Sequence, residues 1–171
     1  MAETALICRV PEAERYVEKY RQRFDPSARR NVPAHVTILY PFMAPELIDA
    51  DVLATLQRVV DSVPRFNYRM ARTQRFPVAL YLDPEPGEPF SALTDGIFRA
   101  FPDYPPFDGK FETVVPHVTV AHGDEPLLCE IEVELRIALP GSGVAARCTE
   151  VVLIENSSGR WEQMHVFALG A

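Results

Sequence analysis

The sequence predicts an α+β protein of two pseudo-symmetric αβ lobes, whose antiparallel sheets form a central groove. The first observation behind this prediction is a repeated segment, Pro-Ala-His-Val-Thr-Ile at 33–38 and Pro-His-Val-Thr-Val at 116–120. The second is the order of the predicted elements, because a helix precedes and a helix follows each of these two strands. We therefore expect one domain over residues 1–171, with one His-x-Thr motif in each lobe.

In the first half, apolar runs alternate with amphipathic stretches. Strands are expected over Ala5–Val10 and over His35–Phe42, which carries the first motif. Between them Pro11 opens a helix, because proline is favoured at the first helical position. Its apolar residues recur every three or four positions, at Ala13, Val17, Tyr20 and Phe24. A second amphipathic helix is expected from Pro45 to Pro64.

The second half starts with two expected strands, Phe66–Gln74 and Val78–Leu82, which a turn separates. A third helix follows, with its apolar face at Phe90, Leu93, Ile97 and Phe101. A proline-rich loop leads to the second motif strand. The chain ends in an expected hairpin of Ala146–Glu155 and Trp161–Leu169.

The segment Leu128–Leu139 fits two patterns. Its apolar residues alternate as in a strand, but they also form one helical face behind Asp124, a candidate N-cap. We expect a helix, because each half then has a helix after its motif strand.

The composition argues against a membrane-spanning or secreted protein. The 171 residues are 47% hydrophobic and 24% charged, as in ordinary globular domains, and no apolar run is long enough to span a membrane. No secretory signal is recognised near the N-terminus. The three cysteines are widely spaced, which indicates reduced thiols in a cytoplasmic protein. Nothing signals an interface, so we expect a monomer.

The net charge of −7 argues against a large non-specific nucleic-acid surface. The charge is uneven, because residues 1–75 carry a net +3 and residues 76–171 carry −10. Arg29 and Arg30 precede the first motif and are weak candidates for substrate binding. Four further arginines could form an anion-attracting face, or else solvated surface: Arg65, Arg69, Arg72 and Arg75.

The motifs carry the chemistry. On a strand, residues two apart point to the same face, so His35 and Thr37 should enter the groove together, as should His117 and Thr119. A lone strand histidine is usually structural, but two copies in equivalent contexts favour acid–base chemistry at a phosphate.

The two other histidines, His122 and His165, lie outside the motifs, and we expect a structural or rim position for His122. The chain has no zinc-type spacing of His or Cys residues, so no metal site is predicted.

These motifs resemble those of the 2H phosphoesterase superfamily, and within it the LigT-like RNA 2',3'-cyclic phosphodiesterases and 2'-5' RNA ligases. The resemblance extends to Arg75–Pro77, to Pro116–Thr119 and to Gly159–Trp161 in the terminal hairpin. It implies hydrolysis, without metal or cofactor, of a 2',3'-cyclic phosphate or 2'-5' phosphodiester in an RNA end or small nucleotide.

In this scheme His35 and His117 are acid and base in an order that the sequence leaves open, while Thr37 and Thr119 donate hydrogen bonds to the phosphate oxygens. Two alternatives stay open: a nucleotide-binding or RNA-end-binding module without turnover, and a hydrolase of another cyclic phosphodiester, such as an ADP-ribose cyclic phosphate.

Overall fold

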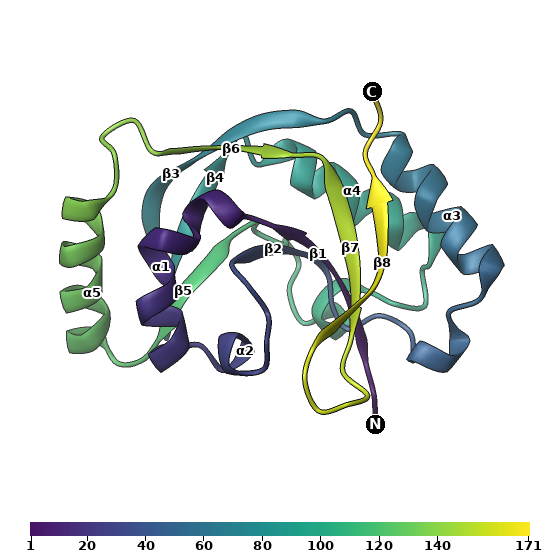
Figure 1. Cartoon of the computed structure of the whole chain (residues 1–171), viewed down its shortest axis with the longest axis horizontal. Helices are drawn as coiled ribbons and strands as arrows, with labels where there is room; N and C mark the ends of the chain where they lie inside the picture. The colour runs from purple at the N-terminus through teal and green to yellow at the C-terminus, as the bar shows by residue number, and fades with distance from the viewer.

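The computed structural model describes all residues from Met1 to Ala171 and contains two four-stranded antiparallel sheets (Figure 1). The first sheet consists, in spatial order, of β2 (His35–Leu39), β1 (Thr4–Arg9), β7 (Glu150–Glu155) and β8 (Glu162–Ala168). The second consists of β5 (Val118–His122), β4 (Ala79–Glu85), β3 (Phe66–Phe76) and β6 (Val144–Cys148). The predicted α+β class with two antiparallel sheets is confirmed, and both motif strands lie at a sheet edge.

The helices cover one face of each sheet. They are α1 (Pro11–Phe24), α2 (Pro26–Arg29), α3 (Ala50–Asp61), α4 (Glu88–Ala100) and α5 (Glu125–Ala138). The ambiguous segment is the helix α5, because the Asp124 side chain caps it by accepting the Leu127 N–H at 3.1 Å. None of these helices has the length and apolar character that crossing a bilayer would require.

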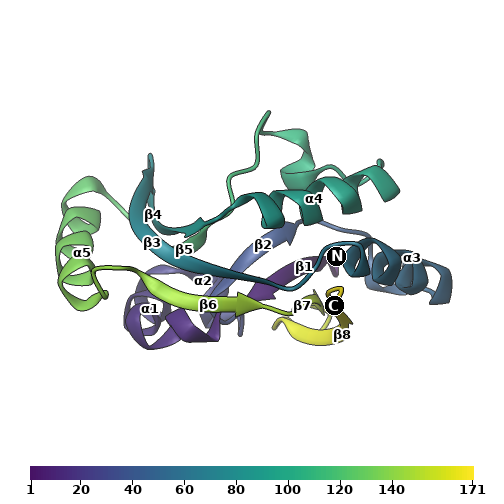
Figure 2. The same ribbon diagram turned by 90° about the horizontal axis from the view of Figure 1, so that it is seen from above.

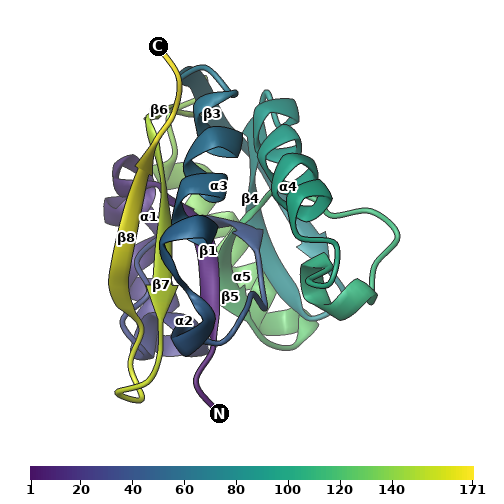
Figure 3. The ribbon, with the colours of Figure 1, turned by 90° about the vertical axis from the view of Figure 1, so that its right-hand side faces the viewer.

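Two helices each pack against the sheet that does not contain the strand preceding them. The helix α1, which follows β1, packs against β5 of the second sheet, and α4, which follows β4, packs against β2 of the first sheet. The helices α5 and α3 lie at opposite ends of the molecule (Figures 1 and 2). Figure 3 shows α3 and α4 side by side, in agreement with the contacts between them. Each half therefore contributes a helix to the sheet of the other.

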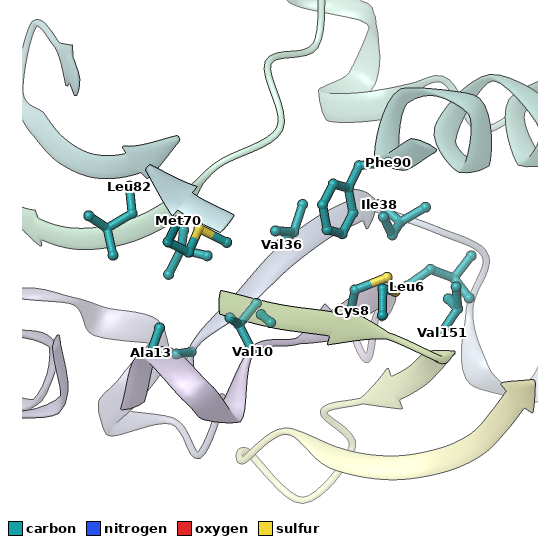
Figure 4. Close-up of a cluster of buried hydrophobic side chains, with 14 of the residues drawn as sticks. Leu6, Cys8, Val10, Ala13, Val36, Ile38, Met70, Leu82, Phe90 and Val151 are labelled. Atoms are coloured by element: carbon teal, nitrogen blue, oxygen red, sulfur yellow. The ribbon is translucent and has the colours of Figure 1, made fainter. Parts of the chain in front are cut away.

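A core of 34 buried residues joins both sheets and their helices. In β2, Val36 and Ile38 are buried and point toward Phe90 of α4 (Figure 4). Because side chains alternate along a strand, His35 and Thr37 face the opposite, open side of the first sheet and are half-buried there. The motif residues thus alternate between the core and the open face of the sheet, as the sequence predicts.

Three expected boundaries are wrong. The strand expected over His35–Phe42 ends at Leu39. The helix expected from Pro45 begins at Ala50, because Pro45–Leu47 forms a 3-10 turn and the Asp49 side chain caps the helix through the Val52 N–H at 2.9 Å. The expected strand Ala146–Glu155 is two strands. Cys148 pairs with Phe66 in the second sheet and Glu150 pairs with Ala168 in the first, so the chain changes sheet at Thr149.

Candidate functional site

The two motif histidines have the same local geometry. His35 begins β2, and His117 lies immediately before β5. The Nδ1 atom of His35 is 2.7 Å from the carbonyl oxygen of Pro33, and that of His117 is 2.7 Å from the carbonyl oxygen of Val115. In both cases the partner is the residue two positions before the histidine, and the strands β2 and β5 contact each other.

This geometry fixes the protonation pattern of each ring. A carbonyl oxygen can only accept a hydrogen bond, so Nδ1 must carry a proton in both histidines. The Nε2 atom is then the site that takes up or gives away a proton. Each ring is therefore held with its reactive nitrogen free.

The surroundings make the two histidines unequal. Burial is the main cause that lowers the pKa of His35 to about 4, and the charges of Arg21 and His117 lower it further. The Pro33 carbonyl and Asp25 oppose this shift. Burial also lowers the pKa of His117, with a smaller contribution from the charge of His122. The influence of His117 on His35 indicates that the two imidazoles are within electrostatic reach.

The motif threonines accompany the histidines on the same faces. Thr37 pairs with Ile7 across β1 and β2, and Thr119 pairs with Tyr81 across β4 and β5. Both threonines are half-buried, and neither hydroxyl makes a hydrogen bond within the protein. A hydroxyl without an internal partner is free to bond a ligand.

A cavity of about 240 Å³ adjoins the first motif. His35 and Thr37 line it together with Arg30, Tyr40 and Trp161. The structure thus places Arg30 beside the motif. Arg29, the other arginine suggested for substrate binding, is exposed on α2 and does not line this cavity.

Aromatic rings surround the second motif instead. Phe76 and Tyr81 stack with centroids 4.3 Å apart, and their centroids lie 5.1 Å and 5.4 Å from the His117 ring. No sequence pattern predicts that these two rings lie beside His117. Their position follows from the pairing of β3 with β4 and of β4 with β5.

A buried ion-pair network holds the segment before His35. The guanidinium of Arg21, which is 2% exposed, donates to the Asp25 carboxylate at 3.1 Å and to the Val32 carbonyl at 3.0 Å. The Glu14 carboxylate accepts the Ala34 N–H at 2.9 Å. Sequence reasoning missed this network, although Arg21 lies four residues after Val17 on the apolar face of its helix.

The remaining charged candidates do not gather at the histidines. Arg72 pairs with Asp83 at 3.2 Å, and Arg75 pairs with Glu125 and Glu132 of α5 at 3.0 and 2.8 Å. Carboxylates thus neutralise two of the four arginines of 65–75, which argues against the anion-attracting face suggested for them.

The two remaining histidines lie outside the motifs and belong to no metal-type cluster. His122 is exposed at the end of β5, and His165 is exposed on β8. No group of three or more His, Cys, Asp or Glu side chains is arranged to hold a metal ion.

Comparison with known proteins places this geometry in context. Residues 10–160 match the model of the 2'-5' RNA ligase superfamily. A protein of Bacillus pumilus (strain SAFR-032), provisionally named a phosphoesterase, is 35% identical over 106 residues, which span 60% of this chain and 58% of that protein.

Solved structures share the fold. LigT of E. coli, solved in complex with 3'-AMP, has a TM-score of 0.66 at 16% identity, covering 99% of this chain and 98% of that chain. A protein of Thermus thermophilus, TT0787, has a TM-score of 0.62 at 17% identity, covering 97% of each chain.

Proposed function

Because the chain belongs to the 2'-5' RNA ligase superfamily of 2H phosphoesterases, we propose that it hydrolyses the 2',3'-cyclic phosphate of a small nucleotide or RNA end. The observation that carries this proposal is the matched pair of imidazoles, each held through Nδ1 with Nε2 free. Hydrolysis of a cyclic phosphodiester needs a base that takes a proton from water and an acid that protonates the departing ribose oxygen.

The unequal surroundings suggest which histidine takes which role. His35 is the base in this proposal, because its strongly lowered pKa keeps the ring neutral at neutral pH. His117 is the acid, because burial lowers its pKa less strongly than that of His35, so the charge of a bound phosphate restores its protonated form more readily. Thr37 and Thr119 donate hydrogen bonds to the non-bridging oxygens and stabilise the charge that develops on them. Arg30 supplies a nearby positive charge, whereas Arg29 is left out.

The experiment compares single alanine variants on one 2',3'-cyclic nucleotide, with folding matched by circular dichroism. His35→Ala and His117→Ala should each lower kcat by roughly 10²–10⁴-fold, the usual contribution of a positioned acid or base. The double variant should be little worse than the worse single one, because groups that act together are strongly non-additive.

The exposed histidines provide matched controls. His122→Ala and His165→Ala should lose far less activity, since neither lies in a motif. Unchanged turnover in His35→Ala, or an equal loss in His122→Ala and His117→Ala, would contradict the proposal. Tight nucleotide binding without any product would favour a binding module instead.

A further inference from the structure

A second cavity continues from the one at His35 along the open face of the first sheet. Its volume of about 480 Å³ is twice that of the cavity at His35, and the two share Ile7, Ile154 and Trp161 among their walls. Arg9, which lines the second cavity, pairs with His35 across β1 and β2, so the two side chains lie on the same face of the sheet. The two cavities therefore adjoin on one face and form a continuous groove.

This groove crosses all four strands of the first sheet. His35 lies on β2, and Gln163, which lines the second cavity, lies on β8. The strand order β2-β1-β7-β8 puts three steps between these two strands, or about 14 Å at roughly 4.8 Å per step. A ligand with its phosphate at His35 must therefore extend beyond its first sugar to reach Gln163.

One face of α1 supplies the polar side of the second cavity. Glu14, Glu18 and Gln22 follow each other at intervals of four residues, so they form one row along the helix, and all three line the cavity. Glu14 already accepts the Ala34 N–H at 2.9 Å. The side chains of Glu18 and Gln22 make no hydrogen bond or ion pair within the protein. The row thus offers polar groups that are free to bond a ligand.

The sheet and the loop before β2 supply further polar groups to this cavity. The Arg9 guanidinium donates to the side-chain oxygen of Gln163 at 2.7 Å, which leaves the amide nitrogen of Gln163 free to donate. The side-chain nitrogen of Asn31 donates to the Trp161 carbonyl at 2.9 Å, which leaves its oxygen free to accept. The cavity therefore presents both donors and acceptors.

The charge of the second cavity disfavours a second phosphate. Its lining carries two carboxylates, those of Glu14 and Glu18, and one guanidinium, that of Arg9, so its net charge is −1 (+1 − 2). The next phosphate of an RNA chain would meet these carboxylates, and like charges repel. A hydroxyl group both donates and accepts hydrogen bonds, so an uncharged, hydroxyl-rich group matches this lining.

We propose that the second cavity binds an uncharged, hydroxyl-rich part of the substrate, namely a second sugar beyond the one that carries the reactive phosphate. The inference rests on the proposed function, because it places that phosphate at His35 and Thr37. It narrows the substrate class to a small cyclic phosphodiester with two sugar units, in place of an RNA chain. The volume of about 480 Å³ lies within the roughly 300–1,000 Å³ of typical ligand pockets, so a sugar ring has room.

Sugar phosphates test this inference by calorimetry, because they keep the phosphate and vary the part beyond the first sugar. The wild-type protein is titrated with glucose 6-phosphate, and with trehalose 6-phosphate and maltose 6'-phosphate, which both contain it. At least one of the disaccharide phosphates should bind roughly 5- to 150-fold more tightly than glucose 6-phosphate, the value of two net hydrogen bonds. Glucose 1,6-bisphosphate should gain nothing, since its second phosphate meets the carboxylates. No gain with either disaccharide phosphate, or a gain with the bisphosphate alone, would overturn the inference.

Variants of the α1 row show whether the gain arises in this cavity. Glu18→Ala combined with Gln22→Ala should remove most of the gain, and should leave the affinity for glucose 6-phosphate unchanged. Glu130→Ala, which removes an exposed carboxylate of α5 outside the cavity, is the matched control. A gain that persists in the folded Glu18→Ala/Gln22→Ala protein would also refute the inference.

These binding results do not depend on turnover. If the wild-type protein hydrolysed no cyclic nucleotide, but the gain appeared and was lost in the double variant, the proposed function would fail and the sugar subsite would stand. If it hydrolysed cyclic nucleotides while all the sugar phosphates bound alike, only the subsite would fail.

Discussion

Replacement of Arg21 by methionine tests whether a buried ion pair maintains the segment that orients His35. The side chains of Arg21 and Asp25 are 2% and 4% exposed, and the pair is 3.1 Å apart. Removing one partner of a buried pair typically costs about 3–5 kcal/mol, because the other charge is left without compensation. Asp25 keeps the N–H and the hydroxyl of Ser27 as donors at 3.0 and 2.9 Å. We therefore expect the lower end, about 3 kcal/mol.

The assay is urea unfolding at pH 7. With m-values of about 1–3 kcal/mol/M, this loss shifts the midpoint by about 1–3 M. Arg21→Met combined with Asp25→Asn should recover part of the stability, since the buried carboxylate of Asp25 no longer lacks its positive partner, while the partly exposed Glu14 keeps its charge. Arg29→Met is the control, because Arg29 is exposed and makes no side-chain hydrogen bond or ion pair. A loss below about 1 kcal/mol in Arg21→Met, or no recovery in the double variant, would refute the reasoning.

Three further predictions concern the site. Thr37→Val and Thr119→Val should each lower kcat by roughly 10- to 150-fold, the value of about 1.5–3 kcal/mol for a hydrogen bond to a charged oxygen, whereas Thr→Ser should be milder. Wild-type kinetics in both Val variants would show that the hydroxyls are structural. The free energy of unfolding should fall as the pH drops from 6.5 toward 4, because the unfolded chain then binds a proton that folded His35 excludes. His35→Ala should flatten this slope, and an unchanged slope would contradict the assigned shift. Turnover should survive EDTA, since neither the histidine pair nor the threonine donors require a metal; loss with EDTA and recovery with one divalent ion would exclude this mechanism.

Local signals predicted most of the elements correctly. For Leu128–Leu139 they left a helix and a strand equally open, and the helix chosen because each half then has one after its motif strand is confirmed as α5. The start of α3 was misplaced because Pro45 suits the first position of an α-helix and of a 3-10 turn equally well. The break at Thr149 was missed because a single residue separates β6 from β7 and neither a proline nor a glycine marks the change of sheet.

Tertiary placement was harder to predict from local patterns. The motifs placed His35 and His117 correctly at two strands, and their assignment as catalytic residues stays a prediction. No local pattern, however, brings Trp161 beside Tyr40, because Trp161 lies between β7 and β8 while Tyr40 follows β2 at the opposite edge of the sheet. The apolar face of a helix also does not indicate which sheet it packs against. The sequence therefore could not predict that α1 packs against β5 and α4 against β2.

This packing of α1 and α4 makes each half of the chain incomplete. With β1, α1 and β2 alone, the apolar face of α1 would lack β5, and the core face of β2 would lack α4. A half-length polypeptide could cover both surfaces only by exchanging helices with a second copy of itself. The strands are shared as well, because β7 and β8 return from the end of the chain to the first sheet, so neither half could form and cover its sheet alone. Because both parts belong to one polypeptide, the contact between the motif strands β2 and β5 does not depend on protein concentration.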